Sequence, residues 1–391
     1  MARRLRVAAG DNVRDLPDHE ALVRSIRRWE SGRIASLSER YRLLFCRAFG
    51  MSEGNLFHQD DRGSETVATV ASPRPPTGCH DLEAMASFRG ADRQVGGGHL
   101  YATVLGYLER DVAPRLFGGS DGAATFVAAA AFTEMAGWMA HDAGQDDLAG
   151  HHFARALDLA GIGGDRQLEA HILGSMSYLS RHLGKGGDAV RLARRGSTML
   201  AESRRAAPAM EARLLGMAAR GFAELGEPDE CSRLLAKAEN TLQREPAIVS
   251  PWAGPYDQGT LALDAARSMV VLRQLSAARR QVEQAIALRS TNRATRSRAL
   301  GQLVLANILL ETGELDEACV VMRKVIEETQ ALSSMVVTRQ LAEVRGRLEA
   351  YRGEEIVVDF LAVLDQTLRE RRWLYQWGGS RREPGGPALR A

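Results

Sequence analysis

The feature that most constrains this chain is a pattern of amphipathic helical pairs that recurs from about residue 100 onward. Each pair surrounds a tight turn, and the predicted turn positions are Gly144, Gly184, Gly226, Arg273 and Gly313. These positions are 40, 42, 47 and 40 residues apart. Two antiparallel helices approach closely only where small side chains meet, and glycine permits the tight turn between them. The chain is therefore predicted to be all-α, built from stacked helical hairpins.

The small residues of these pairs occupy regular positions. The first copy has Gly137 and Ala140 before its turn, and Ala149, Phe153 and Ala156 after it. This spacing resembles the tetratricopeptide repeat, although the repeats here are longer than its standard length of about 34 residues. The resemblance implies a right-handed superhelix with a concave groove.

In arrays of this type the first helix of each pair lines the concave surface, so the register names candidate groove residues. They are Glu134, Trp138, His141, Asp142, His171, Tyr178, Arg181, Arg213, Arg220, Arg267 and Asn307. Two aromatic side chains followed by arginines would hold a short peptide, by stacking at one end and carboxylate pairing at the other. The alternative for Trp138 and Tyr178 is that they fill gaps between neighbouring helices. The segment 251–256 would form either a lid or the rim of a long connection.

The N-terminal segment has a different pattern, Ser-Ile-Arg-Arg-Trp-Glu-Ser-Gly at residues 25–32. Leu22, Ile26 and Trp29 form one apolar helical face. The candidate DNA-contacting residues lie off this face or just beyond the helix: Arg24, Ser25, Arg27, Arg28 and Arg33. Arginines on a short helix can contact phosphates and guanine edges in the major groove. The alternative is a solvated basic surface.

Two further motifs follow this helix in order: Ser-Glu-Arg-Tyr-Arg-Leu-Leu at 38–44, and Gly-Met-Ser-Glu-x-x-Leu-Phe at 50–57. Together the three are similar to the lambda-repressor/Cro-like (XRE-type) helix-turn-helix family, in the variant found in actinomycete regulators. The resemblance implies a DNA-reading head over residues 1–57. That family needs two helices before its recognition helix, and here only residues 2–9 resemble the end of the second one. Either the true start lies upstream or the head is truncated.

The distribution of charge supports a basic head. Residues 1–50 hold eleven arginines and six acidic side chains, a net charge of +5, which leaves −3 for the rest because the whole chain carries +2. This arrangement suits a nucleic-acid contact confined to the N-terminus. Only three of the 51 basic residues are lysines, which suggests a GC-rich genome.

The predicted organisation has four parts. After the head, residues 58–98 contain Pro-rich and Gly-rich stretches and predict a linker, interrupted by a short helix near 81–89. Residues 99–377 would form about five repeats with a final pair of capping helices, and 378–391 would be a disordered tail.

Other functional classes lack support in the sequence. The spacing of the nine histidines does not place three ligands on one face with a carboxylate, so we expect no metal site. Residues 161–165 resemble a phosphate-binding loop but lack its lysine and strand, and predict a turn. The four cysteines form no CxxC pair, and the apolar stretch 126–140 is too short to span a bilayer. We expect a soluble cytoplasmic protein, not an enzyme, with no cofactor and no membrane contact.

These patterns predict a DNA-binding transcriptional regulator whose repeat body senses a peptide or small ligand, or binds a partner protein. The arrangement is similar to the peptide-responsive quorum-sensing receptors of Gram-positive bacteria. We also expect a homodimer, because one small head would bind one operator half-site only weakly. The alternative is a protein-interaction scaffold that has lost DNA binding through truncation of its helix-turn-helix.

Overall fold

The computed structural model describes residues 5–6, 18, 20–23, 26, 41, 77–97, 100–118, 122–203, 205–244, 250–289 and 295–378. The chain forms two compact units. One is Arg74–Val357, and the other combines Met1–Pro73 with Val358–Ala391. The described elements are all helices, which agrees with the predicted all-α class.

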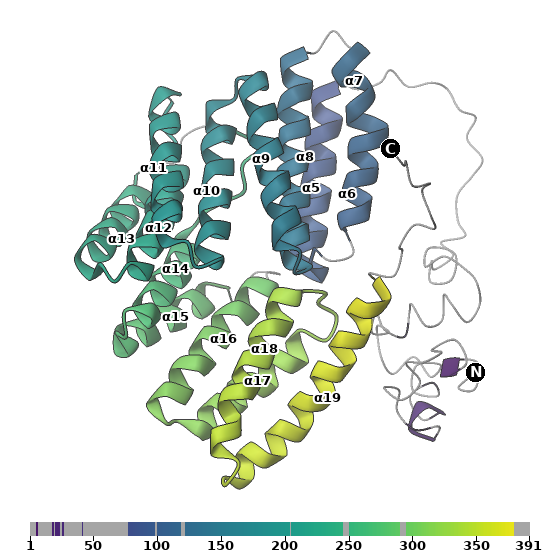
Figure 1. Ribbon diagram of the computed structural model, residues 1–391, viewed down its shortest axis with the longest axis vertical. Coiled ribbons are helices and arrows are strands. Elements are labelled where there is room, and N and C mark those ends of the chain that lie inside the picture. The colour runs from purple at the N-terminus through teal and green to yellow at the C-terminus, as the bar shows by residue number, and fades with distance from the viewer. Residues whose placement is uncertain are drawn as a thin grey trace, which may run out of the picture. The chain divides into compact units, whose positions relative to one another are not determined.

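The unit Arg74–Val357 begins with α5 (Thr77–Val95), α6 (Tyr101–Tyr107), the π-helical segment η2 (Leu108–Val112) and α7 (Ala113–Gly118). Helical pairs follow: α8 (Gly122–Asp142) with α9 (Asp146–Gly163), α10 (Arg166–His182) with α11 (Gly186–Glu202), α12 (Pro208–Glu224) with α13 (Pro228–Leu242), α14 (Gln258–Val271) with α15 (Leu275–Arg289), and α16 (Thr295–Thr312) with α17 (Leu315–Glu328). The unit ends with α18 (Met335–Leu348) and a 3₁₀ turn, η3 (Glu349–Tyr351). Figure 1 shows the pairs stacked one after another.

The turn inside every pair has a left-handed residue where the sequence predicts it. The φ angles are 80° at Gly144, 74° at Gly184, 74° at Gly226 and 82° at Gly313. Arg273 occupies the fourth turn with φ 61°, a value that L residues other than glycine rarely adopt. The five predicted turns are therefore confirmed, including the one without glycine.

The small residues of the first pair allow α8 and α9 to pack closely. Phe153 on α9 is fully buried, and a Cβ atom built on Gly137 of α8 would lie 2.6 Å from its ring. No real Cβ contact is that short, so the aromatic ring occupies space that only a glycine leaves free. The same pattern motivated the repeat assignment from the sequence.

The connection after this pair is a turn, as residues 161–165 predict. Gly164 ends α9 with φ 73°, and the Asp165 side chain accepts hydrogen bonds from the backbone N–H groups of Gln167 and Leu168. Asp165 therefore caps the N-terminus of α10, a common role for aspartate.

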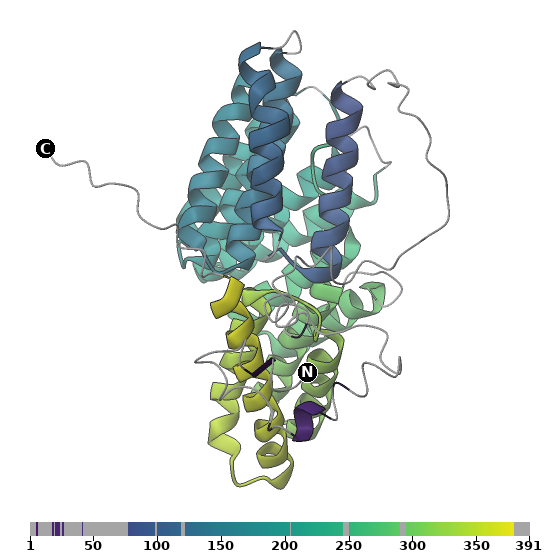
Figure 2. The same ribbon diagram turned by 90° about the vertical axis from the view of Figure 1, so that its right-hand side faces the viewer.

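The array turns back on itself, so that its last helices contact its first. Helix α16 packs against α5, and α18 packs against α8 (Figure 1). Figure 2 shows the same arrangement from the side, with α5–α8 above α16–α18. The Arg296 guanidinium of α16 makes the polar part of this closure, because it binds Asp92 of α5 at 2.7 Å and Asp142 of α8 at 3.2 Å.

Helix α5 corrects the predicted linker. Residues 77–95 form one continuous helix, longer than the short helix predicted near 81–89. Met85 is buried in the core formed with α8, and Leu82 and Phe88 pack against that core. The apolar residues at 82, 85 and 88 share one face, and this face holds α5 in the repeat body.

Helix α8 is the central helix of that core. Among the described residues it alone has the length and apolar composition to cross a membrane, but 78% of its most hydropathic window is buried inside the protein. Its alanines and Phe132 pack against α5, α6 and α9. The apolar stretch is thus explained by packing within the repeat body.

The other unit contains most of α19 (Glu355–Gly378), whose buried side chains Phe360, Leu364 and Leu368 recur at helical spacing. In the N-terminal part, Asp18 accepts a hydrogen bond from the Ala21 N–H at 2.7 Å, and Leu22 and Ile26 are buried. The predicted DNA-contacting residues Arg24, Ser25, Arg27, Arg28 and Arg33 lie outside the described residues, and so does the tail from 379.

Candidate ligand-binding cavity

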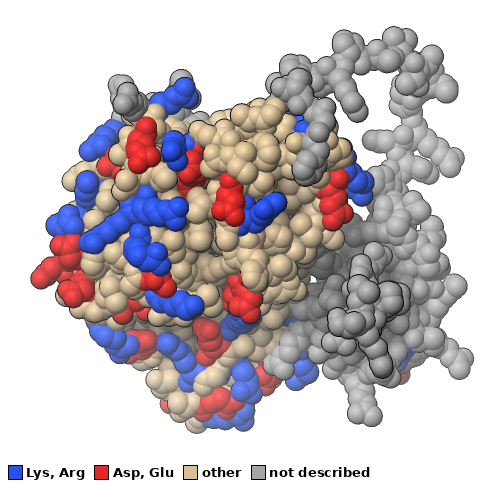
Figure 3. Space-filling model, turned by 45° about the horizontal axis from the view of Figure 1, so that its top comes forward, with Lys and Arg blue, Asp and Glu red and all other residues tan. Residues whose placement is uncertain are grey.

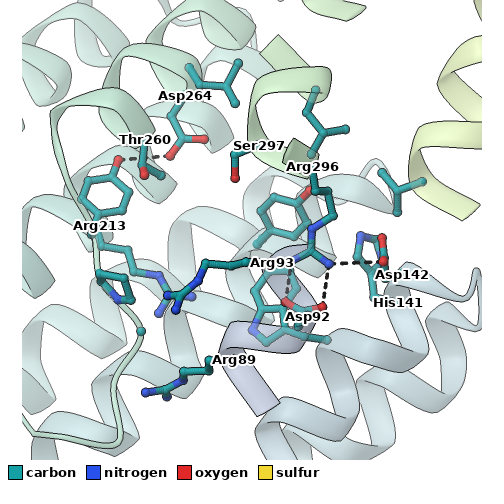
Figure 4. A pocket seen from close by; sticks show the side chains of 18 of the residues that line it. Arg89, Asp92, Arg93, His141, Asp142, Arg213, Thr260, Asp264, Arg296 and Ser297 are labelled. Atoms are coloured by element: carbon teal, nitrogen blue, oxygen red, sulfur yellow. Dashed lines mark hydrogen bonds and ion pairs between the residues drawn. The ribbon is translucent and has the colours of Figure 1, made fainter. Parts of the chain in front are cut away.

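The repeat body contains a cavity of about 380 Å³, and Figure 4 shows side chains that line it. Its walls come from α5, from the first helices of the repeats, and from the segment that precedes α14. Cavities of this size hold a small molecule or a few peptide side chains.

Most of the predicted groove residues line this cavity. They are Glu134, Trp138, His141, Asp142, His171, Tyr178, Arg213 and Arg267. Three others, Arg181, Arg220 and Asn307, lie outside the lining. Arg220 is buried behind the wall, where it binds Asp264 at 2.9 Å, and Arg181 binds Glu224 at 3.0 Å.

One wall is aromatic. The rings of Trp138 on α8 and Tyr178 on α10 lie 5.0 Å apart at an angle of 60°. The Trp138 Nε1–H donates to Glu134 at 2.7 Å and lies 3.2 Å from the Ser175 hydroxyl. Because the indole N–H is satisfied within the wall, the rings present an apolar surface to the cavity.

A buried polar network crosses the base of the cavity. The Ser175 hydroxyl donates to Glu134 at 2.7 Å, and Arg213 donates to the same hydroxyl at 2.9 Å and to Nε2 of His171 at 3.0 Å. Burial lowers the pKa of His171 well below its ordinary value, and the nearby charges of Arg213 and Arg89 lower it further. His171 is therefore neutral and accepts the hydrogen bond from Arg213.

A second network lies beside Tyr178. Asp264 accepts from Arg220 and from the Tyr256 hydroxyl, the latter at 3.0 Å. Burial raises the pKa of Tyr256 well above its ordinary value, and the Asp264 charge raises it further. The charge of Arg220, followed by burial, lowers the pKa of Arg181 to about 10. This region therefore already holds more positive charge than it neutralises.

Arg267 adds to this excess. It lines the cavity, and within the described part of the chain it has no hydrogen bond or ion pair. Burial lowers the pKa of Arg267, and the neighbouring Arg220 charge lowers it further. A buried guanidinium without a partner is stabilised when an anion binds beside it.

Helix α5 supplies the opposite wall. Asp92 binds Arg296, while Arg93 extends into the cavity and has no carboxylate partner among the described residues (Figure 4). Arg89 turns instead to the segment before α14 and donates to the backbone carbonyl groups of Trp252 and Ala253. The pKa of Arg89 is lowered by burial.

The segment 251–256 forms a fixed rim. Trp252 is buried against Phe132 in the α8 core, and the backbone N–H of Gly254 donates to His171 at 3.3 Å. At the start of the segment, the Ser250 backbone N–H donates to Gln167 of α10. Of the two alternatives that the sequence leaves open, the structure supports the rim.

Several cavity residues were not predicted from the sequence, namely Arg89, Asp92, Arg93, Thr260, Asp264, Arg289 and Arg296. The three on α5 were assigned to a linker. The signal that could have found them is the spacing of Leu82, Met85 and Phe88, because a helix with that apolar face places Arg89, Asp92 and Arg93 together on a neighbouring face.

The structure also brings together His141, Asp146 and His182, whose possible ligand atoms all lie within 4.8 Å of one another. The prediction from the sequence was that no three ligands lie on one helical face with a carboxylate. It considered single helical faces, whereas these residues come from the ends of three helices that the turns bring together.

Comparisons with known proteins show which fold the repeat body resembles. No family model and no curated protein sequence matches this chain. Among solved structures, it is similar to the crystal structure of Rap protein complexed with competence and sporulation factor, with a TM-score of 0.52 and 11% sequence identity. The similarity covers 78% of this chain and 90% of that chain. At this level of identity the similarity concerns the fold alone: the body is an all-helical array of tetratricopeptide-like repeats.

Proposed function

We propose that this protein is a ligand-responsive regulator whose repeat body binds a short peptide, or a small molecule of similar size, through a carboxylate. The proposal places the protein in the cytoplasm and gives it a binding role rather than a catalytic one. The basic N-terminal segment would bind operator DNA, and the ligand would alter that binding.

The proposal that the cavity binds a ligand rests on one observation: the carboxylates that line the cavity are paired, whereas two of its arginines are not. Every carboxylate that lines the cavity has a hydrogen-bonding partner: Glu134 has Trp138, Asp264 has Arg220, and both Asp92 and Asp142 have Arg296. By contrast, Arg93 and Arg267 have none among the described residues. A ligand carboxylate would form charge-assisted hydrogen bonds there, and the aromatic wall would accept an apolar side chain.

The cavity lining has an excess of positive charge, and we compare it with one outer face of the protein. On the face shown in Figure 3, arginine and lysine side chains are interspersed with aspartate and glutamate over the described residues. The similar Rap structure is a complex with competence and sporulation factor, which supports a ligand-binding role for a body of this fold.

The test uses the full chain and pooled fluorescent pentapeptides, each pool prepared with a free C-terminal carboxylate and with a C-terminal amide. We expect at least one free-acid pool to bind, and amidation to weaken that pool about 10-fold or more, since hydrogen bonds to charged groups contribute roughly 1.5–3 kcal/mol. Arg267→Gln should cause a similar loss. Arg280→Gln, on the exposed surface of α15, is the matched control and should bind as the parent does.

The ligand proposal fails if no pool binds or if the amidated pools bind equally well. The DNA proposal is tested separately, by titrating the full chain with the promoter fragment of its own gene at several salt concentrations. Replacing Arg27 and Arg28 with alanine should reduce the slope of log affinity against log salt by about 2. An unchanged slope, or no binding by the parent chain, would favour the scaffold alternative.

A further inference from the structure

Outside the cavity's charged networks, three side chains with metal-binding chemistry meet at helix ends. His141 lies in the last turn of α8, Asp146 is the first residue of α9, and His182 is the last residue of α10. The tight turn at Gly144 brings the first two together, and the stacking of α10 on α9 brings in the third.

The two distances between the histidines and Asp146 can be compared with those around a shared ion. Nε2 of His182 lies 3.5 Å from Oδ2 of Asp146. Two ligand atoms on a tetrahedral zinc ion, each about 2.1 Å from the metal, lie about 3.4 Å apart. Nδ1 of His141 is closer, 2.6 Å from Oδ1 of Asp146, because a proton joins these two atoms. A metal ion would take the place of that proton at Nδ1, and the proton would move to Nε2 of the same ring.

The His141 ring is free to make this change. Its side chain is 4% exposed, yet its Nε2 atom has no hydrogen-bonding partner in the described structure. Buried polar atoms of this kind almost always have partners. The ring is held by Asp146 and by edge contacts with Trp138, Tyr178 and His182, so metal binding breaks no hydrogen bond other than the one it replaces.

We propose that His141, Asp146 and His182 bind a divalent transition-metal ion such as zinc, with water completing the coordination. Two imidazoles and one carboxylate are typical ligands of such ions. His182 is 29% exposed, which gives the ion access from solvent. This site does not depend on the peptide proposal, since it would bind metal in the absence of any cavity ligand.

One neighbour opposes the metal and sharpens the test. The Arg339 guanidinium lies 3.4 Å from Oδ2 of Asp146 and donates to the Gly144 carbonyl at 2.9 Å. Its positive charge repels a divalent ion. Arg339→Gln should therefore tighten metal binding. If the cluster serves only to stabilise the turn, this variant will show no tighter binding.

The experiment titrates the chelator-treated full chain with cobalt(II) and follows visible absorption, then displaces cobalt with zinc. We expect one saturable site with the strong absorption of a four-coordinate cobalt ion.

Variants make the assignment specific. His182→Gln alters a partly exposed side chain and should weaken binding at least 100-fold, while Arg339→Gln should strengthen it. His151→Gln, at an exposed position on α9, is the matched control and should bind as the parent does. The proposal is overturned if cobalt shows no saturable site, or if His182→Gln and the parent bind equally. If His182→Gln does not fold, the Arg339→Gln titration decides.

Discussion

At the scale of single residues, the cavity is defined by which polar groups have partners. His171 illustrates the cost of such a network, because it must stay neutral to accept hydrogen bonds from Arg213 and from the Gly254 N–H. Protonation would remove the acceptor and place a second positive charge beside Arg213. The lowered pKa of His171 expresses this cost.

That cost predicts a pH dependence of stability. The folded-state pKa of His171 lies below the ordinary value of 6.5, so the stability it contributes is present above pH 6.5 and is lost as the pH falls below it. The loss approaches about 1.4 kcal/mol per pH unit for one such group. His171→Gln should therefore show a smaller fall in unfolding free energy between pH 7.5 and 5.5, measured by urea denaturation.

The exposed His151 supplies the comparison for this measurement. His151→Gln should keep the full pH dependence of the parent chain. An equal slope in the parent and in His171→Gln would show that His171 titrates normally in the folded state.

At the scale of elements, the helical pairs depend on the residue at each turn. Four of the five turns have glycine, and Arg273 takes the same left-handed conformation with a Cβ atom. Its side chain pairs with Glu311, but it is 70% exposed, so this ion pair contributes little. The fourth pair therefore carries backbone strain that the other pairs avoid.

Arg273→Gly should relieve this strain. We expect the unfolding free energy to rise by up to about 1 kcal/mol, since the left-handed conformation costs an L residue roughly 1–2 kcal/mol and the flexibility of glycine in the unfolded chain offsets part of the gain. Thermal and urea denaturation would measure it.

Gly313→Ala is the reciprocal change. No heavy atom lies within 4 Å of the Cβ that it would add, so only the backbone at φ 82° is affected. It should lower the unfolding free energy by about 1 kcal/mol.

The contradicting outcome for Arg273→Gly is a loss of stability. It would mean that the ion pair with Glu311 stabilises the fold by more than the left-handed conformation of Arg273 costs.

The sequence predicted these elements well where a local pattern determines them. Turn positions follow from small residues and helical periodicity. The structure has a left-handed residue at both Gly144 and Arg273, as the sequence predicts. The cavity was only partly predictable, because Arg296 meets Asp92 across 204 residues and no local period encodes that contact. The same reason hid the approach of His182 to Asp146.

At the scale of the whole repeat unit, the main feature is the contact between its first and last helices. Arg296 is 25% exposed and holds two carboxylates, one of them, on Asp142, only 6% exposed. Removing the cation would leave Asp92 without its partner and Asp142 with only its hydrogen bonds from the Gly97 N–H and the Ser334 hydroxyl, which is strongly destabilising for poorly solvated carboxylates.

Arg296→Met should lower the unfolding free energy by about 2–3 kcal/mol. It should also speed amide hydrogen exchange in α5, because that helix loses its polar attachment to α16. Arg280→Met, on the exposed surface, should change neither quantity. Unaltered exchange in α5 would show that its apolar face alone holds it in place.

The return of the array onto its first helices has a consequence for how the protein folds. In an open repeat array each unit contacts only its neighbours, so folding can begin anywhere and stability is close to a sum of local terms. Here, Arg296 and Asp92 join segments 204 residues apart. Closing so long a loop costs entropy before the contact forms, which raises the contact order and slows the last step of folding. The two ends of the array should then unfold together rather than fray separately.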